Sequence, residues 1–449
     1  MKENEGTTRI NEDRYNRAIE YLYGLQHHGI KLGLSNIRRV LELLGDPQAN
    51  FRSVHVAGTN GKGSTSSIIA SVLQRAGFKV GLFTSPHLVS FTERIRINGS
   101  PIPVDEVISI TDIIRGLLTR ETELMAPTFF EFVTAMAFYY FRQERIEWAV
   151  IETGMGGRLD STNVIEPEVT AITQIAMDHS EFLGDSIELI AAEKAGIVKS
   201  GVPVITAAQS DEAEQIILDR AVQLGSDVYR FGHDFRAENI YTDIDGTTFD
   251  YSSDIGPVRF TVPLSGKHQA ENASIAIKVI ELILGPAADT SMISNGVSKT
   301  RWEGRCELFN WEVPILFDGA HNPASIDALI SSLKMIYLKQ FSDIIFIIGS
   351  MGDKDIKGLL ERLLPVGRLT IFTTLNFERA ASSHELKRMA DRHCLNTIAV
   401  ENTGDALRAA KKNYKEGDLI VVTGSFYAVG EAKGHIGQDS SLIGLTEFR

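Results

Sequence analysis

The chain has 449 residues, of which 45 are Lys or Arg and 58 are Asp or Glu, so its formal net charge is −13. This length predicts two or three domains, and a hydrophobic content of 43% is enough for sizeable cores, which excludes a disordered chain. The acidic balance argues against nucleic acid or an anionic membrane as the main partner, but it leaves room for a small anionic ligand.

The two cysteines, Cys306 and Cys394, cannot form a disulfide framework and lack the spacing of a zinc site. The first residues are polar and contain no apolar signal core. The longest apolar runs, such as 344–348, are far too short to span a membrane. We therefore expect a soluble cytoplasmic protein without a membrane partner.

Apolar residues at helical spacing between positions 14 and 44 predict two helices, broken near Gly29 and Gly33. An apolar strand over 53–57 then leads into the string GTNGKGST and a helical run over 66–76. The alternation continues with strands predicted over 79–83, 148–152, 169–174 and 203–206, and helices over 129–141 and 187–195. This alternation predicts an α/β fold with a mostly parallel sheet covered by helices.

Between residues 234 and 263, short alternating segments around Asp245–Gly246 predict a β-hairpin. A helix over 271–284 follows, and then a second alternating series. Its predicted strands are 315–317, 344–348, 369–372, 397–400 and 419–422. We predict a P-loop-type domain over residues 1–300, which includes the hairpin region 234–263, and a smaller Rossmann-like α/β domain over 301–449.

The loop after the first strand carries the strongest chemical signal. Three glycines let its backbone curl around an anion, Lys62 places a cation where phosphate charge would lie, and the following helix adds a favourable dipole. The loop departs from GxxxxGK[ST] because Gly63 separates Lys62 from Ser64, so ordinary P-loop kinase geometry is not assumed. The alternative is a glycine-rich turn with a solvated lysine. The nucleotide-binding candidates here are Gly58, Thr59, Asn60, Gly61, Lys62, Gly63, Ser64 and Thr65.

The string HVAGTNGKGST resembles the ATP loop of the Mur ligase superfamily, and its GKGS form is similar to the folylpolyglutamate synthase branch. Further motifs agree with that branch in order and spacing. They are TSPHL (84–88), FTERI (91–95), ETGMGGR with DSTN (152–163), DH (178–179), EKAG (193–196), HQAENA (268–273), GR (304–305) and DGAHNP (318–323). The resemblance runs from about residue 15 to about residue 431, nearly the whole chain.

This resemblance implies ATP-dependent amide formation. A substrate carboxylate attacks the γ-phosphate to give an acyl phosphate and ADP, and the amine of an amino acid then displaces phosphate. Positioning and charge neutralisation dominate such chemistry, with a bound metal polarising the phosphoryl oxygens. The resemblance further implies ATP and Mg²⁺, allows for a monovalent cation, and favours a monomer with its site in the cleft between the domains.

The resemblance assigns magnesium coordination to Ser85, Glu152 and His179. Glu152 ends an apolar strand, where α/β proteins present active-site groups, and His179 lies just past the next strand. Imidazole is an unusual magnesium ligand and a lone histidine is more often at the surface, so the role of His179 rests on the resemblance. Lys194 is either an ordinary amphipathic lysine or, by the resemblance, a carbamylated lysine that supports a metal, which requires a lowered pKa.

Four later residues are candidates for the nucleotide or the reacting groups. The resemblance assigns Asn272 to the nucleotide, and helix capping is the alternative. Arg305, at the domain link, is suited to clamp a phosphate bidentately as the domains close, with an inter-domain ion pair as the alternative. Asp318 and His321 follow a strand end, which supports a site independently of the family. The resemblance places Asp318 on ATP and His321 near the reacting groups.

The resemblance places a pteridine-containing substrate against the loop after the second strand. The substrate-binding candidates there are Ser85, His87, Phe91 and Arg94. Phe91, with Phe129 and Phe130, offers flat apolar surface to a pterin ring, although aromatic residues at this spacing are more often core. Ser425 and Tyr427, after the last strong strand, are candidates for the incoming amino acid.

The first functional hypothesis is a ligase that adds L-glutamate to the γ-carboxylate of a reduced folate, with Lys62, Lys194 and His321 as catalytic candidates. A bifunctional enzyme that also joins glutamate to dihydropteroate is the alternative within this class. Ligases of peptidoglycan precursors share only the GTNGK string. A non-catalytic ATP-driven switch gives no reason for Glu152, His179 and Asp318 all to stand at strand ends.

Overall fold

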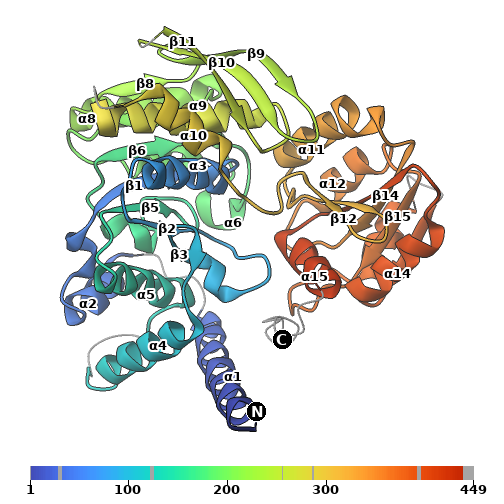
Figure 1. Cartoon of the computed structure of the whole chain (residues 1–449), viewed down its shortest axis with the longest axis horizontal. Helices are drawn as coiled ribbons and strands as arrows, with labels where there is room; N and C mark the ends of the chain where they lie inside the picture. Colours follow the sequence, from blue (N-terminus) through green and yellow to red (C-terminus); the bar gives the residue numbers. More distant parts are fainter. Residues whose placement is uncertain are drawn as a thin grey trace. The chain divides into compact units, whose positions relative to one another are not determined.

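The computed structural model describes residues 2–28, 33–121, 126–254, 256–285, 288–391 and 396–437. These residues fall into two compact units (Figure 1). Unit 1 comprises Met1–Ser85, Thr92–Phe235 and Ser274–Gly296, and unit 2 comprises Pro86–Phe91, Arg236–Ala273 and Val297–Arg449. The predicted helix break near Gly29 and the second cysteine, Cys394, lie outside the described residues.

Unit 1 is built on a sheet in which the described residues form eight strands, in the order β4-β3-β2-β5-β1-β6-β7-β8. The strands from β2 to β8 in that order run parallel, whereas the short strands β3 and β4 run antiparallel to their neighbours. The bounds are β1 (Arg52–Ala57), β2 (Val80–Phe83), β3 (Ile95–Ile97), β4 (Ser100–Pro101), β5 (Trp148–Glu152), β6 (Val169–Ile172), β7 (Val204–Thr206) and β8 (Val228–Arg230). The mostly parallel sheet predicted from the alternation is confirmed.

Helices cover this sheet, and α3 packs on its centre against β1, β2 and β5. The start of α5 is set by a capping box, in which the side chains of Thr128 and Glu131 each accept from the backbone N–H of the other. The bounds are α1 (Lys2–Gly24), α2 (Ser35–Leu43), α3 (Lys62–Arg75), α4 (Val104–Leu118), α5 (Phe129–Gln143), α6 (Ser180–Leu183), α7 (Ile187–Ala195), α8 (Asp211–Leu224), α9 (His268–Leu284) and α10 (Thr290–Ser298). None of the described helices combines the length and the apolar character that a bilayer span requires.

Unit 2 contains a second α/β sheet, whose described strands follow the order β12-β13-β17-β14-β15-β16. Strand β12 is antiparallel to β13, and the other neighbours are parallel. The strands are β12 (Glu307–Asn310), β13 (Pro314–Phe317), β14 (Asp343–Ile348), β15 (Leu369–Thr373), β16 (Thr397–Val400) and β17 (Asp418–Thr423), and the helices are α11 (Pro323–Met335), α12 (Ile356–Leu363), α13 (Ser383–Ala390), α14 (Thr403–Asn413) and α15 (Phe426–Ile436). The Rossmann-like pattern predicted for this region is confirmed.

Successive side chains along the strands of this sheet point to opposite faces and pack in two separate hydrophobic cores. In β14, Phe346 packs with residues of α11 and α12, whereas its neighbours Ile345 and Ile347 pack with residues of α14 and α15. The chain therefore leaves β13 toward one face, through α11, and leaves β17 toward the other face, through α15. Adjacent parallel strands whose connections diverge in this way leave a crevice at their carboxyl ends, where open α/β sheets bind ligands.

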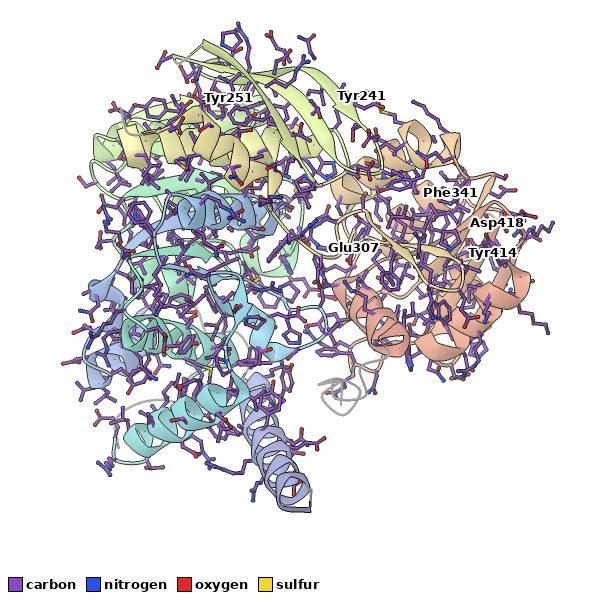
Figure 2. All side chains as sticks on the ribbon, viewed as in Figure 1. Tyr241, Tyr251, Glu307, Phe341, Tyr414 and Asp418 are labelled. Carbon is purple, nitrogen blue, oxygen red and sulfur yellow. The ribbon has the colours of Figure 1, made fainter. Side chains whose placement is uncertain are left out.

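A three-stranded antiparallel sheet, β9 (Arg236–Thr242), β10 (Thr247–Ser253) and β11 (Gly256–Val262), occupies the predicted hairpin region. Asp245–Gly246 does form a turn, but the turn joins β10 to β9, a strand that the sequence analysis missed because most of its side chains are exposed. Tyr241 on β9 is 64% exposed, whereas Tyr251 on β10 is fully buried (Figure 2).

This small sheet belongs to unit 2, although the sequence analysis placed region 234–263 within the first of its two domains, 1–300 and 301–449. Two contacts explain the grouping. Ile244, in the turn, packs against the core of unit 2, and the hydroxyl of Ser265 donates to the carbonyl oxygen of Asp243, which holds the segment after β11 against that turn.

Removal of a core ring tests the two-core arrangement of unit 2. Phe346 is fully buried, so Phe346→Ala is expected to lower the free energy of unfolding by about 3–5 kcal/mol, because it removes apolar burial and leaves a cavity. Phe309 on β12 is 43% exposed, and Phe309→Ala is expected to cost less than about 1 kcal/mol. Urea unfolding of both variants measures the difference. Equal losses would contradict the assignment of Phe346 to the core.

Candidate active site

The predicted phosphate loop joins β1 to α3 and is pinned to the end of β6. Gly58 has φ +147°, and a Cβ at this position would stand 1.9 Å from the hydroxyl oxygen of Thr173, so only glycine fits. The backbone N–H groups of Thr59 and Asn60 donate to the carbonyl oxygen of Gln174, at 2.8 and 3.1 Å. Hydrogen bonds and packing against the segment after β6 therefore hold the curl of the loop.

The loop ends at Gly61, whose φ of +90° turns the chain into α3. The amine of Lys62, the first residue of this helix, donates to the carbonyl oxygens of Gly58 at 3.1 Å and Thr59 at 3.2 Å. Residues 63–65 form the first turn and are buried. A curled loop at the N-terminus of a 14-residue helix, with a cation on it, has the geometry and the charge that bind phosphate.

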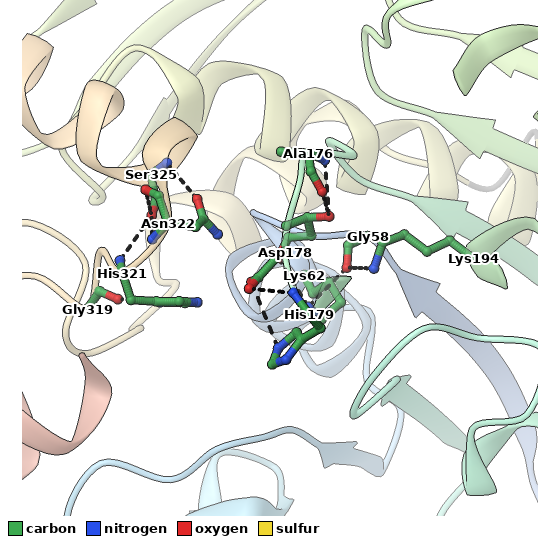
Figure 3. A network of polar contacts seen from close by, with 11 residues as sticks. Gly58, Lys62, Ala176, Asp178, His179, Lys194, Gly319, His321, Asn322 and Ser325 are labelled. Carbon is green, nitrogen blue, oxygen red and sulfur yellow. Dashed lines mark hydrogen bonds and ion pairs between the residues drawn. The ribbon is translucent and has the colours of Figure 1, made fainter. Parts of the chain in front are cut away.

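A second lysine reaches the same carbonyl oxygen. The amine of Lys194, on α7, donates to the carbonyl oxygen of Gly58 at 2.8 Å, as Figure 3 shows. Burial and, to a lesser extent, the charge of Lys62 lower the pKa of Lys194 to about 7, against the opposing effect of Asp178 and Asp160. A large fraction of this amine is therefore neutral at neutral pH. The lowered pKa that carbamylation requires is present.

Two of the predicted magnesium ligands lie together at the carboxyl ends of neighbouring strands. Glu152 is the last residue of β5 and is buried, and the backbone N–H of Ser85, two residues after β2, donates to its Oε2 at 3.2 Å. A carboxylate and a hydroxyl supply oxygen ligands, which Mg²⁺ prefers. The donor chemistry of this pair fits the ion.

The third predicted ligand, His179, precedes α6 with a left-handed backbone, φ +51°. The backbone N–H of His179 donates to Oδ1 of Asp178 at 2.9 Å. The ring Nε2 of His179 lies 3.9 Å from Oδ2 of the same carboxylate (Figure 3). Across the part of the chain that the structure describes, no three His, Cys, Asp or Glu side chains gather closely enough to hold a metal ion. Metal coordination by His179 stays a prediction.

The glycine-rich motif after Glu152 interlocks with the EKAG motif of α7. A Cβ at Gly157 would stand 2.7 Å from the carbonyl oxygen of Glu193, and a Cβ at Gly196 would stand 2.3 Å from the Cβ of Arg158. The guanidinium of Arg158 also pairs with the carboxylate of Glu193 at 2.7 Å. The two motifs thus form one packed element that fixes the helix bearing Lys194.

A buried polar network beneath this element was missed by the sequence analysis. Nε2 of His55, on β1, lies 2.9 Å from the hydroxyl of Thr162, which donates to Asp160 at 2.5 Å. Because the hydroxyl of Thr162 donates its proton to Asp160, Nε2 of His55 carries a proton and donates to the hydroxyl oxygen of Thr162. Burial lowers the pKa of His55 to about 3 and keeps it neutral. Asp160 also accepts from the N–H of Met155 at 2.9 Å. The available signal was a histidine within an otherwise apolar strand.

The aromatic candidates for the pteridine site separate into two environments. The guanidinium of Arg94 lies 5.2 Å from the ring centre of Phe129, which stacks on Tyr23 at 5.5 Å with an interplanar angle of 15°. Phe130 instead packs against Phe83, with its ring 2.5 Å from where a Cβ at Gly154 would stand. Arg94 and Phe129 are therefore brought together, whereas the partly buried Phe130 packs against Phe83 and Gly154.

Phe91, predicted to offer a flat face to a ligand, is fully buried. Its ring contacts that of His87, with centroids 6.5 Å apart, and His87 is 7% exposed. A fully buried ring has no face open to a ligand, so stacking by Phe91 is not supported by this arrangement. The two residues shape the loop after β2.

In unit 2, Asp318 and His321 follow β13, as predicted. The carboxylate of Asp318 accepts from the backbone N–H groups of Cys306 and Ala320, each at 2.9 Å. Nδ1 of His321 lies 2.9 Å from the carbonyl oxygen of Gly319, which can only accept, so Nδ1 carries the proton (Figure 3). In the neutral ring, Nε2 is then left as an acceptor.

The other two nucleotide candidates of unit 2 are held by their neighbours. The amide of Asn272 donates to Gln269 at 3.0 Å, and Gln269 contacts His268 at 3.1 Å. The guanidinium carbon of Arg305 lies 4.3 Å from the ring centre of Phe426, the first residue of α15. The sequence analysis did not single out Phe426, and no short-range signal marks its contact with a residue 121 positions away.

The candidates for the incoming amino acid serve as structural groups in unit 2. Ser425 caps α15 by accepting from the N–H of Ala428 at 3.0 Å, and its hydroxyl donates to the carbonyl oxygen of Gly349 at 3.0 Å. Tyr427 packs on Phe377, with ring centroids 4.9 Å apart. Their approach to an amino acid stays a prediction.

Comparison with known proteins gives matches over most of the chain. Residues 56–280 match the family model of the Mur ligase middle domain, and residues 304–426 match that of the Mur ligase glutamate ligase domain. A dihydrofolate synthase/folylpolyglutamate synthase of Bacillus subtilis is 33% identical, covering 93% of this chain and 98% of that protein. A folylpolyglutamate synthase of Lacticaseibacillus casei is 34% identical, covering 92% of this chain and 96% of its own.

A solved structure supports the same grouping. The crystal structure of Mycobacterium tuberculosis folylpolyglutamate synthase, complexed with ADP and AMPPCP, has a TM-score of 0.87 and 30% sequence identity to this chain, covering 95% of this chain and 99% of its own. The similarity includes both α/β sheets, because it spans nearly the whole length of both proteins.

The lowered pKa of Lys194 predicts a specific pH dependence of stability. Between pH 7 and pH 10.5 the unfolded chain holds a proton on this amine that the folded chain lacks, so this residue makes stability rise with pH in that window, by about 1.4 kcal/mol per pH unit. Below pH 7 both states are protonated and the full cost of burying the charge is present. Lys194→Met should remove this slope in urea unfolding between pH 7 and 9. Lys357→Met, at a 74% exposed side chain, should keep it; equal slopes in all three proteins would contradict the burial of the amine.

Proposed function

The chain belongs to the Mur ligase family, and on this basis we propose that it is an ATP-dependent ligase of the folylpolyglutamate synthase type, which joins the amine of L-glutamate to the γ-carboxylate of a reduced folate. The observation that carries the proposal is the loop at Gly58, where two lysine amines converge on one carbonyl oxygen beside a helix N-terminus. A curled loop with this charge, followed by a helix N-terminus, suits the phosphates of ATP.

The reaction proceeds in two steps that the residues of the chain can serve. An oxygen of the folate carboxylate attacks the γ-phosphorus, the bond to the β-phosphate oxygen breaks, and ADP leaves with an acyl phosphate remaining. The amine of glutamate then attacks the acyl carbon, loses a proton, and phosphate leaves. Charge neutralisation and placement are the main demands of both steps. Lys62 and the N-terminus of α3 would supply the charge neutralisation.

Magnesium is the metal that we propose for this reaction. Glu152 and Ser85 would hold it, with His179 as a third ligand by the family resemblance, and the ion would polarise the phosphoryl oxygens. The family resemblance also allows for a monovalent cation. Glu152 is buried and lies at the strand edge beside the phosphate loop, since β1 and β5 are neighbours in the sheet.

We further propose that Lys194 is carbamylated. A neutral amine adds to carbon dioxide and releases a proton, which converts a cation into a carbamate anion. The pKa of about 7 supplies the neutral amine, and the neighbouring charge of Lys62 would favour the anion that results. A carbamate at this position would give the metal site a second acidic group.

Residues of unit 2 are proposed for the nucleotide and for proton transfer. Nε2 of His321 is placed to act as an acceptor and would take the proton that the glutamate amine loses. Arg305 is proposed to bind a phosphate group, and Asn272 and Asp318 to contact the nucleotide. These roles follow from the family resemblance and from the position of Asp318 and His321 at a strand end.

The folate is proposed to lie against the loop after β2. Ser85 and Arg94 would contact it, and the Phe129 ring, stacked on Tyr23 and adjacent to a guanidinium, would support its pterin ring. His87 and Phe91 would shape that loop. We also propose that the protein works as a cytoplasmic monomer, with ATP, L-glutamate and the folate as its partners.

Dihydropteroate is a second acid substrate to consider, because the B. subtilis relative carries the names of both activities. Its carboxylate would be activated in the same way as that of a folate. The bifunctional enzyme is therefore the alternative within the same chemistry, and it needs no additional catalytic group.

Phosphate release tests the proposed function. With ATP, Mg²⁺ and L-glutamate, purified protein is expected to release phosphate only when tetrahydrofolate is added, because the γ-phosphate needs a carboxylate acceptor. Mass spectrometry should find the folate heavier by one glutamyl residue. Dihydropteroate in place of tetrahydrofolate separates the bifunctional enzyme from the monofunctional one. Release that is indifferent to any folate or pteroate would favour an ATP-driven switch and discard the ligase.

If Glu152 binds magnesium, its substitution should change the magnesium dependence of the reaction. Glu152→Gln should lower kcat by about 100-fold at low magnesium, since loss of a ligating carboxylate weakens metal binding, and excess magnesium should restore only part of it. Calorimetric titration of Mg²⁺ into protein saturated with a non-hydrolysable ATP analogue measures the binding directly. Glu166, whose side chain is 83% exposed, provides the matched control, and Glu166→Gln should behave as the wild type. Full activity of Glu152→Gln at low magnesium would remove Glu152 from the metal site.

A further inference from the structure

Phe426 stands at the crevice between β13 and β17 and touches three groups of the candidate site. Its ring lies on the backbone of Gly319, where an added Cβ would stand 2.3 Å from the ring edge. The guanidinium carbon of Arg305 is 4.3 Å from the ring centre. The ring of His321 is tilted by 59° against it, with centroids 5.6 Å apart.

The backbone that carries Arg305 is fixed independently of this ring. The N–H of Gly304 donates to Glu307 at 2.8 Å, and the N–H of Cys306 donates to Asp318 at 2.9 Å. Glu307, labelled in Figure 2, is in turn held by the amine of Lys433, which lies 2.9 Å from both of its carboxylate oxygens. Carboxylates therefore hold the backbone on both sides of Arg305.

The side chain of Arg305 contacts both its own turn and the ring of Phe426. Its Nη1 donates to the carbonyl oxygen of Gly304 at 3.0 Å, and its guanidinium faces the ring of Phe426. A planar guanidinium over an aromatic face is attracted by the ring and keeps its N–H groups directed outward, in the plane that a phosphate requires. His321 meets the same ring while Gly319 holds its Nδ1.

We propose that Phe426 is a positioning residue of the ligase, whose ring holds the guanidinium of Arg305 and the imidazole of His321 in one arrangement on the backbone of Gly319. This inference rests on the proposed function, in which Arg305 binds a phosphate of ATP and His321 accepts a proton. The glycine at 319 is explained by the same arrangement, because any side chain there would displace the ring.

The alternative is that Phe426 only fills space, since it also packs against the core beneath α15. The two roles differ in what they change. A space-filling ring affects the free energy of unfolding, whereas a positioning ring affects the KM for ATP through Arg305 and does so only while Arg305 is present. A double-mutant cycle separates them.

The experiment measures steady-state kinetics of the full chain with tetrahydrofolate and L-glutamate, together with urea unfolding of each variant. Phe426→Leu is expected to raise the KM for ATP by about fivefold and to lower kcat, because the cation loses its aromatic face. Phe426→Tyr keeps that face and should stay within about twofold of the wild type. In the Arg305→Met background, Phe426→Leu should leave the KM for ATP unchanged. Phe309→Leu, at an exposed ring of the same unit, should match the wild type.

Each of the remaining outcomes is decisive. A KM for ATP that Phe426→Leu leaves unchanged, or raises by the same factor with and without Arg305, overturns the positioning role, even if the variant is less stable. If Arg305→Met itself leaves the KM for ATP unchanged, the proposed phosphate contact of Arg305 fails first, and the inference fails with it. A raised KM in Arg305→Met with a normal KM in Phe426→Leu leaves the proposed function intact and rejects the inference alone.

Discussion

The carbonyl oxygen of Gly58 is the point on which the site in unit 1 depends. Lys62 reaches it from within the loop and Lys194 reaches it from α7, so two amines share one acceptor in a buried setting. Burial of the Lys194 amine, together with the nearby charge of Lys62, lowers the pKa of Lys194. The loop therefore combines the amine of Lys62 with a second amine whose pKa is lowered, beside a helix N-terminus that favours anions.

The glycine motifs around this point are explained by packing. Gly58 lies against Thr173, Gly157 lies against the backbone of α7, and Gly196 lies against Arg158, each at a distance that no Cβ could occupy. The loop that leaves Glu152 and the helix that bears Lys194 are consequently locked to one another.

In unit 2 the candidate residues are brought together by the strand connections and not by a glycine-rich loop. The connections from β13 and β17 diverge to opposite faces of the sheet, and the crevice between them receives Asp318, His321 and the start of α15. The ring of Phe426 lies against the backbone of Gly319 and contacts both Arg305 and His321. An apolar contact of this kind supports polar groups without competing for their hydrogen bonds.

The amino-acid sequence by itself determined the class of fold, the position of most strands and the phosphate loop, because these are local properties: apolar periodicity, glycine placement and a strand that leads into a helix are read within a few residues. Local pattern did not reveal the mostly exposed strand β9, and it did not show that the ring of Phe91 is fully buried. The meeting of Lys194 with Gly58, 136 residues apart, was decided by tertiary structure alone, and so was the contact of Phe426 with Arg305. Burial, and with it the charge state of a lysine, depends on which distant segments exclude water from it, and no local pattern carries that information.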